Sequence, residues 1–250
     1  MTVFEFGKEH PKSVLLLHGG GLSWWDRRAA AELLAEHYHV ILPILDGHGG
    51  SDCPFTSIED NAVRLTDYID THLDGQVTVL SGLSLGGQIA VEMISQRPDI
   101  CRCALIESAL LEPMRLTHAL IRPSVAMSYG LIRQRWFAKL QAAYLGIPKE
   151  LFSEYYRDTC RISGSDMTAF LKANCSYVPK AALSKATARV KIIAGCRETG
   201  SIRRSAKLLH RLIPGSSMEL LPGLRHGELS ICQPKRFAEL LRHWEEEDIQ

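Results

Sequence analysis

Hydrophobic positions along the chain fall into short apolar runs, and these alternate with longer segments in which apolar residues recur every three to four positions. The short runs are rich in Val, Ile and Leu, which is typical of strands buried on both faces. They predict strands at Val3–Phe6, Ser13–Leu17, His39–Ile44, Val77–Ser81, Cys103–Glu107, Val190–Ala194 and Met218–Leu221. The alternation predicts an α/β fold, with a mostly parallel central sheet flanked by helices.

The longer segments predict the helices that connect these strands. They cover Trp24–Glu36, Ile58–Leu73, Leu85–Gln96, Ile202–Leu212 and Pro234–Glu247. The spacing from Ser23 to Asp26 is similar to that of a capping box, which predicts a helix start at this point.

The stretch from Glu112 to Ala188 contains no convincing strand, and prolines and glycines interrupt its helical pattern. We interpret residues 112–188 as a helical cap inserted into one core domain formed by residues 1–111 and 189–250. Half of the Phe, Trp and Tyr residues of the chain lie in this stretch. They either line a site for an apolar ligand or form a small core of the cap itself.

Composition limits the kinds of partner that we expect for the protein and the compartment in which we expect it. A net charge of +1 predicts no attraction to nucleic acid or to anionic membranes. The first apolar run, Val14–Leu17, is too short for a signal peptide or a membrane span. Seven cysteines without a CxxC pair indicate neither a disulfide framework nor a zinc site. We therefore expect a cytoplasmic protein, monomeric or homodimeric, that acts on a small molecule.

The pattern Gly82-Leu83-Ser84-Leu85-Gly86 is the strongest chemical signal in the chain. It is a GxSxG motif that directly follows a predicted strand and directly precedes a predicted helix, as a nucleophile elbow requires. The first N–H groups of a helix have no partner inside it, so the N–H of Leu85 can donate to an oxyanion. The motif predicts that Ser84 is a nucleophile.

A second glycine-rich segment, His18-Gly19-Gly20-Gly21, follows the strand at Ser13–Leu17. Three glycines allow this loop to approach the serine closely, and the N–H of Gly20 is the expected second oxyanion donor. Taken alone, the segment would be read as a plain glycine turn.

Together, the HGGG segment, the GLSLGG segment and the segment PGLRHGELS near the end resemble the α/β-hydrolase superfamily. The loop from Asp46 to Ser51 also resembles its counterpart there, so the resemblance covers nearly the whole chain. It implies an α/β-hydrolase fold and a catalytic triad, whose chemistry requires no metal or organic cofactor. It says little about the substrate.

The order serine, acid, histidine in that superfamily points to His226 as the base, because His226 follows the last predicted strand. The acid departs from the usual pattern: the segment after the penultimate strand offers Glu198 where an aspartate is common. We assign Glu198 as the acid, with Glu107 at the end of the preceding strand as the alternative.

These residues predict a serine hydrolase that cleaves a carboxylic ester, or a similar acyl bond, through an acyl-enzyme. The aromatic cap suggests an apolar or aromatic substrate, with Gly21, Trp24, Tyr129 and Trp136 as candidate contacts. Cleavage of carbon–carbon bonds, acyl transfer to another acceptor, or a weakly catalytic small-ligand receptor are alternatives on the same framework.

Overall fold

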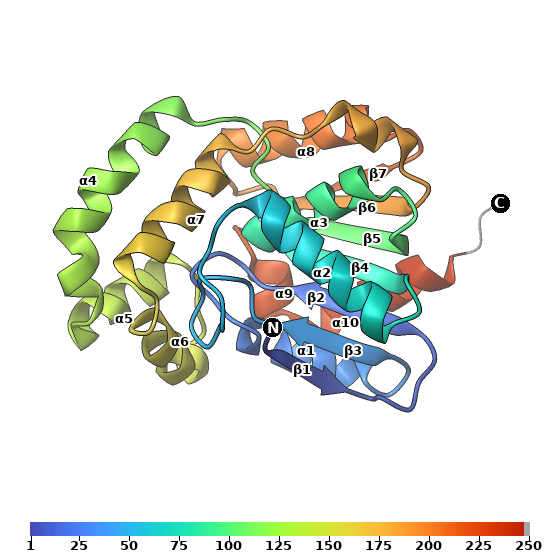
Figure 1. Cartoon of the computed structure of the whole chain (residues 1–250), viewed down its shortest axis with the longest axis horizontal. Coiled ribbons are helices and arrows are strands. Elements are labelled where there is room, and N and C mark those ends of the chain that lie inside the picture. The colour runs from blue at the N-terminus through green and yellow to red at the C-terminus, as the bar shows by residue number, and fades with distance from the viewer. Residues whose placement is uncertain (248–250) are drawn as a thin grey trace.

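A computed structural model describes residues 1–247 of the chain. Its centre is a seven-stranded sheet with the order β1-β3-β2-β4-β5-β6-β7 (Figure 1). β1 pairs antiparallel with β3, and every other pair of neighbouring strands is parallel. The carboxyl ends of six strands therefore lie along one edge of the sheet, where the catalytic signals were predicted.

The strands closely match those predicted from the apolar runs. They are β1 (Val3–Phe6), β2 (Ser13–Leu17), β3 (His39–Pro43), β4 (Val77–Leu83), β5 (Cys101–Glu107), β6 (Arg189–Gly195) and β7 (Ser217–Leu221). Side chains of β2 show why its run is continuously apolar. Leu15 and Leu17 belong to the core on one face of the sheet, and Val14 and Leu16 belong to the core on the other.

Helices cover both faces of the sheet. One face carries α2 (Ile58–His72), α3 (Leu85–Gln96) and α8 (Gly200–Leu212), and the other carries α1 (Trp25–Leu34) and α10 (Pro234–Glu246). A short helix, α9 (Glu228–Cys232), which the hydrophobic pattern did not predict, separates His226 from α10.

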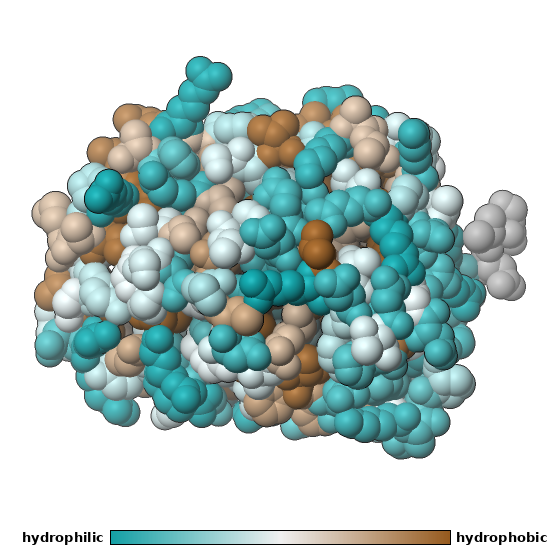
Figure 2. Space-filling view, in the orientation of Figure 1, coloured by the Kyte–Doolittle hydropathy of each residue, from teal (hydrophilic) through white to brown (hydrophobic). Residues whose placement is uncertain are grey.

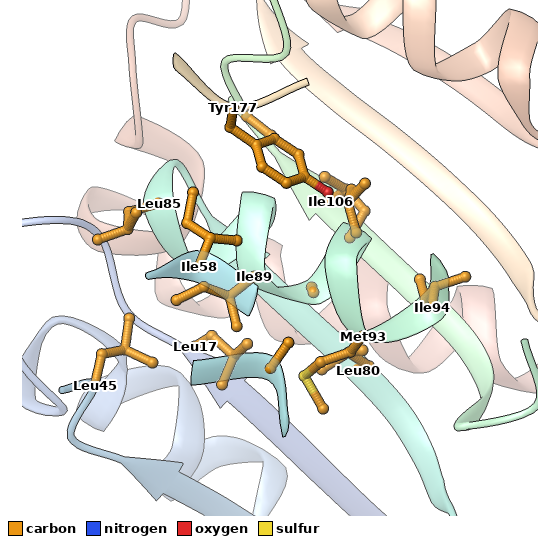
Figure 3. Close-up of a cluster of buried hydrophobic side chains, with 14 of the residues drawn as sticks. Leu17, Leu45, Ile58, Leu80, Leu85, Ile89, Met93, Ile94, Ile106 and Tyr177 are labelled. Carbon is orange, nitrogen blue, oxygen red and sulfur yellow. The ribbon is translucent and has the colours of Figure 1, made fainter. Parts of the chain in front are cut away.

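Helix α3 is buried along almost its whole circumference. Figure 3 shows Ile89 of this helix beside Leu17 of the sheet and Met93 beside Leu80, and Leu85 belongs to the same core. Burial on all sides fixes the helix that begins at the predicted nucleophile.

Between β5 and β6 the chain forms helices and no strand. They are α4 (Arg115–Ile132), α5 (Arg135–Tyr144), the 3-10 helix η1 (Lys149–Leu151), α6 (Phe152–Thr159), α7 (Gly164–Ser176) and the 3-10 helix η2 (Ala181–Lys185). α4 and α5 lie together at the left end of the molecule as viewed in Figure 1. No helix within residues 1–247 combines the length and apolarity needed to cross a bilayer.

The predicted capping box at the start of α1 is wrong. The hydroxyl of Ser23 donates to the carbonyl of Gly49 at 3.4 Å, and the residue at the N-cap is Trp24, whose side chain makes no capping bond. The carboxylate of Asp26 accepts instead from the N–H of Gly19 at 3.1 Å. The Asp26 carboxylate, which the local sequence pattern had assigned to the helix cap, is thus used in a tertiary contact instead.

Candidate active site

Ser84 occupies a strained turn between β4 and α3. Its φ of 54° and ψ of −111° are unfavourable for a residue with a side chain. The flanking glycines make the turn possible: a Cβ on Gly82 would lie 2.2 Å from the carbonyl oxygen of Gly86, and one on Gly86 would lie 2.5 Å from that of His18. Both contacts are with backbone, so glycine is required at both positions of the motif.

The backbone around Ser84 is held on both sides. Its N–H donates to the carbonyl of Glu107 at the end of β5 over 2.9 Å, and its own carbonyl accepts from Gln88 inside α3 over 3.0 Å. Helix α3 begins at Leu85, whose N–H points out of the helix start. A strained residue anchored in this way keeps its hydroxyl in a fixed position relative to the helix N-terminus.

The glycine-rich loop lies against this turn. A Cβ added to Gly20 would lie 3.4 Å from the Cβ of Leu85, which places the two residues side by side. None of the hydrogen bonds found within residues 1–247 is donated by the N–H of Gly20. Gly20 and Leu85, from two separate elements, are thus neighbours in the structure, and a shared role of their N–H groups as oxyanion donors stays a prediction.

Two buried side chains fix the glycine-rich loop. Asp26 accepts from the N–H of Gly19, and the ring of His18 contacts the carbonyl of the same residue at 2.9 Å. The N–H of Leu45 donates to Nε2 of His18 at 3.0 Å, so the proton of this ring resides on Nδ1, which donates to Gly19. Burial, with the nearby His48 adding to it, lowers the pKa of His18 well below its ordinary value. His18 is therefore a neutral structural residue.

His226 and Glu198 form a hydrogen-bonded pair. Nδ1 of His226 lies 2.8 Å from Oε2 of Glu198. The two residues come from the loops after β7 and β6. These loops approach each other closely, as a Cβ added to Gly195 at the end of β6 would lie 2.1 Å from the carbonyl oxygen of Leu224. The bond leaves Nε2 of His226 as the ring nitrogen that can accept a proton.

The second oxygen of Glu198 is also bound. Oε1 accepts from the hydroxyl of Ser108 at 2.7 Å and from the N–H of Gly195 at 2.8 Å. Burial alone would raise the pKa of Glu198, but the hydrogen bonds from His226 and Ser108 and the charge of His226 outweigh it and lower the pKa. Glu198 is thus held as a carboxylate.

His226 also lies beside the nucleophile turn. The next residue, Gly227, lies close to Leu83, which directly precedes Ser84: a Cβ added to Gly227 would be 3.2 Å from the side chain of Leu83. The structure therefore brings the three predicted triad positions to one edge of the sheet, at the carboxyl ends of β4, β6 and β7.

Glu107, the alternative acid, faces another way. Its carboxylate lies 3.6 Å from the guanidinium of Arg27 and 3.4 Å from the N–H of Ser230. Arg27 is fully buried and also lies 4.0 Å from Asp26. Burial, partly offset by Arg27, raises the pKa of Asp26 to about 7. Glu107 thus belongs to a buried charge cluster beneath the nucleophile turn.

A cavity of about 520 Å³ opens at the histidine. Its polar lining includes His226, Glu198 and Thr199 together with the charged residues Arg197, Arg225 and Glu228, and Tyr144 and Leu145 at the end of α5 contribute apolar surface. Ser84 is not among the lining residues. A second cavity of about 350 Å³ lies against the other side of α5. Its lining is mostly apolar, and it shares Ala143 with the first; the lining residues are Lys139, Ala142, Ala143, Ile147, Lys149 and Phe152.

The four candidate substrate contacts lie elsewhere, since none of them lines these two cavities as the described residues define them. Trp24 stacks on Phe4 at 3.9 Å between ring centroids, and the hydroxyl of Tyr129 donates to the carbonyl of Ile162. Trp136 is exposed on α5, and the space beside Gly21 is open. Their contact with substrate stays a prediction.

Sequence reasoning missed two residues that position the site, Ser108 and Asp26. Ser108 carries a usable signal, because it is a hydroxyl residue directly after a strand whose carboxyl end faces the site. Its φ of 57° adds a second strained position next to the nucleophile turn. In the described part of the chain, no group of three or more His, Cys, Asp or Glu residues is arranged to hold a metal ion.

Comparison with known proteins shows the family of the chain. The model of the alpha/beta hydrolase family matches residues 14–240. An "AB hydrolase superfamily protein" of Gibberella zeae is 30% identical over 243 residues, which cover 93% of this chain and 79% of the relative. An (E)-2-((N-methylformamido)methylene)succinate hydrolase of Acinetobacter baylyi is 28% identical over 151 residues, 54% of each chain.

Solved structures show the same fold at lower identity. An esterase from Exiguobacterium antarcticum superposes with a TM-score of 0.82 at 19% identity, covering 98% of this chain and 95% of that one. A bromoperoxidase from Bacillus anthracis gives a TM-score of 0.83 at 20% identity over the same shares. The family match and the fold agree, and this chain belongs to the α/β-hydrolase family.

Proposed function

We propose that this hydrolase cleaves a carboxylic ester, or a similar acyl bond, of a small apolar or aromatic substrate through an acyl-enzyme. In this proposal Ser84 is the nucleophile, His226 the general base and Glu198 the acid that orients His226. The observation that carries it is the 2.8 Å bond between His226 and Glu198 beside a serine held at positive φ.

The first half-reaction begins when the hydroxyl oxygen of Ser84 attacks the substrate carbonyl. Nε2 of His226 takes the hydroxyl proton, and Glu198 stabilises the resulting imidazolium. The carbonyl oxygen becomes an oxyanion, which the N–H groups of Gly20 and Leu85 stabilise. The tetrahedral intermediate then collapses, and His226 gives the proton to the leaving alkoxide.

In the second half-reaction, water replaces the alcohol. His226 removes a proton from the water, whose oxygen attacks the acyl carbonyl, and the proton then returns to Ser84 as the acid product leaves. Each proton taken by His226 is given back within the same half-reaction, so the cycle needs no further reactant.

The cavities support the choice of substrate. The apolar walls of Tyr144 and Leu145, and of Ile147 and Phe152 beyond them, suit an apolar acyl or aryl group. Because these walls come from residues 143–152, we also propose that residues 112–188 act as a cap over the site. Cleavage of carbon–carbon bonds and acyl transfer use the same residues, and no particular contact favours either.

A fluorophosphonate probe tests the nucleophile. Labelling of the wild-type chain is expected, and it should disappear in Ser84→Ala while the exposed Ser165→Ala control still labels. A panel of p-nitrophenyl esters of graded acyl length then tests the substrate class. Unchanged labelling of Ser84→Ala would refute the assignment, and labelling without turnover of any ester would exclude simple ester hydrolysis.

A further inference from the structure

Large hydrophobic side chains that remain exposed are concentrated on α4 and α5. Of the twelve such side chains found within residues 1–247, nine lie between positions 114 and 145. They are Met114, Leu116, Leu120, Met127, Leu131, Trp136, Leu140, Tyr144 and Leu145. Figure 2 shows apolar side chains along the margin of the molecule that α4 forms. Single exposed apolar residues are ordinary, but a gathering on adjacent helices indicates a contact surface.

On α4 the exposed apolar residues form one line. They follow one another at spacings of four, seven and four residues, which places them within about 60° of each other around the helix axis; they are Leu116, Leu120, Met127 and Leu131. The residues that α4 buries, Ile121, Val125 and Ile132, lie on roughly the opposite side. α4 is therefore apolar on the face turned away from the protein as well as on the packed face.

Helix α5 repeats this arrangement. Trp136, Leu140 and Tyr144 recur every four residues and are exposed, and Tyr144 is 90% exposed. Ala138 and Ala142, on the other side of the helix, are buried. α4 and α5 contact each other, so the two apolar lines belong to one end of the molecule.

The same segment is strongly cationic. Residues 113–149 contain six Lys and Arg residues and no Asp or Glu, although the whole chain has a net charge of only +1. None of the six lies within 4.0 Å of a carboxylate in the part of the chain that the structure describes; they are Arg115, Arg122, Arg133, Arg135, Lys139 and Lys149. Arg115 and Arg122 of α4, and Arg133 at its C-cap, share a face next to the apolar line.

We propose that the α4–α5 surface, defined by these apolar and cationic residues of 113–149, binds the surface of an anionic lipid membrane. Helices whose exposed Met and Leu side chains are flanked by arginine suit the boundary between lipid headgroups and acyl chains. A second copy of the chain fits poorly, because a twofold contact would bring together two sets of cations that have no carboxylate partner. The net charge of the whole chain gave no indication of this surface, because acidic residues elsewhere in the sequence balance its positive charge.

The position of the α4–α5 surface connects membrane binding to the proposed active site. Tyr144 and Leu145 belong both to the exposed apolar set and to the wall of the cavity that contains His226. A lipid-bound chain would thus have its cavity mouth next to the membrane, where apolar esters accumulate. The binding itself is independent of the proposed hydrolysis and is testable without it.

Vesicle flotation with the full chain tests the proposal. Vesicles of equal parts phosphatidylglycerol and phosphatidylcholine should carry the protein upward, and pure phosphatidylcholine vesicles should carry much less. High salt should weaken the binding, because the cations contribute through charge. Arg115→Gln with Arg122→Gln should lower the partition coefficient about fivefold for each arginine removed. Leu116→Glu with Met127→Glu, at positions 76% and 83% exposed, should lower it at least as much.

Val63→Glu provides the matched control, since Val63 is an exposed apolar residue of α2 far along the chain from this surface. It should bind like the wild type. Thermal unfolding and turnover of a water-soluble ester should be unchanged in all of these variants, which separates lost binding from lost folding. Absent flotation with phosphatidylglycerol, or equal flotation of the variants and the wild type, would overturn the proposal. A concentration-dependent dimer that Met127→Glu abolishes, without flotation, would assign the surface to a second copy instead.

Discussion

Replacing Glu198 with glutamine tests the arrangement of the site most directly. The carboxylate accepts three hydrogen bonds, from His226, Ser108 and Gly195. A glutamine has one acceptor oxygen and one NH2 group. If its oxygen keeps the bonds from Ser108 and Gly195, its NH2 group faces Nδ1 of His226. The ring must then accept at Nδ1 and carry its proton on Nε2, which cannot take the proton of Ser84.

The wrong tautomer and the lost charge set the expected magnitude. In triads of this kind, removing the charge of the acid while keeping its shape lowers kcat by about 10³- to 10⁴-fold, or about 4–5.5 kcal/mol of transition-state stabilisation. KM should change little, because Glu198 does not need to contact substrate. Steady-state kinetics with a p-nitrophenyl ester measures both quantities.

Two controls accompany this variant. Glu219→Gln, at an exposed position of β7, should leave kcat and KM unchanged. Glu107→Gln should leave Arg27 with a weaker partner and lower the free energy of unfolding, by about 3 kcal/mol or more, while the folded fraction keeps most of its kcat. A kcat of Glu198→Gln within tenfold of the wild type would refute the proposed role of Glu198. So would a larger loss of kcat in folded Glu107→Gln.

The pH dependence of stability offers an independent check on Glu198. The folded chain lowers the pKa of this carboxyl below the ordinary value of 4.5, so its ionisation stabilises the folded state above that pH. This contribution is lost as the pH falls through the lowered pKa. The wild type should therefore lose stability relative to Glu198→Gln on acidification, as followed by urea unfolding at a series of pH values.

Two further variants test the scaffold of the site. Gly86→Ala should lower the free energy of unfolding by about 3 kcal/mol or more, because its Cβ would collide with backbone. The control is Gly130→Ala in α4, which should be neutral or stabilising because its Cβ meets open space. Equal thermal shifts of the two variants would contradict this reasoning. Asp26→Asn should keep the bond to Gly19 but remove a buried carboxyl whose pKa is raised to about 7. The folded wild type binds the proton of the Asp26 carboxyl more tightly than the unfolded chain does. The stability of the wild type should therefore fall relative to that of Asp26→Asn as the pH rises from 4 to 7, by up to about 4 kcal/mol. A difference in stability between the two proteins that does not vary with pH would count against the buried carboxyl.

Local chemistry in the sequence determined the frame of this protein. Continuous apolar runs predicted all seven strands, because strands buried on both faces tolerate few polar residues. The glycines around Ser84 predicted the sharp turn, since a Cβ added to Gly82 or Gly86 would lie within about 2.5 Å of a backbone oxygen. The order of motifs also placed Ser84, Glu198 and His226 at the same edge of a parallel sheet.

The tertiary structure decided which distant groups meet. Two glutamates lie near the carboxyl ends of neighbouring strands, Glu107 as the last residue of β5 and Glu198 in the loop after β6. Only the paths of the loops after β6 and β7 select Glu198 as the partner of His226. Asp26 was read as part of a helix cap and instead holds Gly19, because a tertiary contact offered it a buried donor. The apolar periodicity of α4 likewise does not say which stripe is packed. The sequence of a helix fixes the spacing of its apolar residues, whereas their burial depends on what the rest of the chain packs against each face.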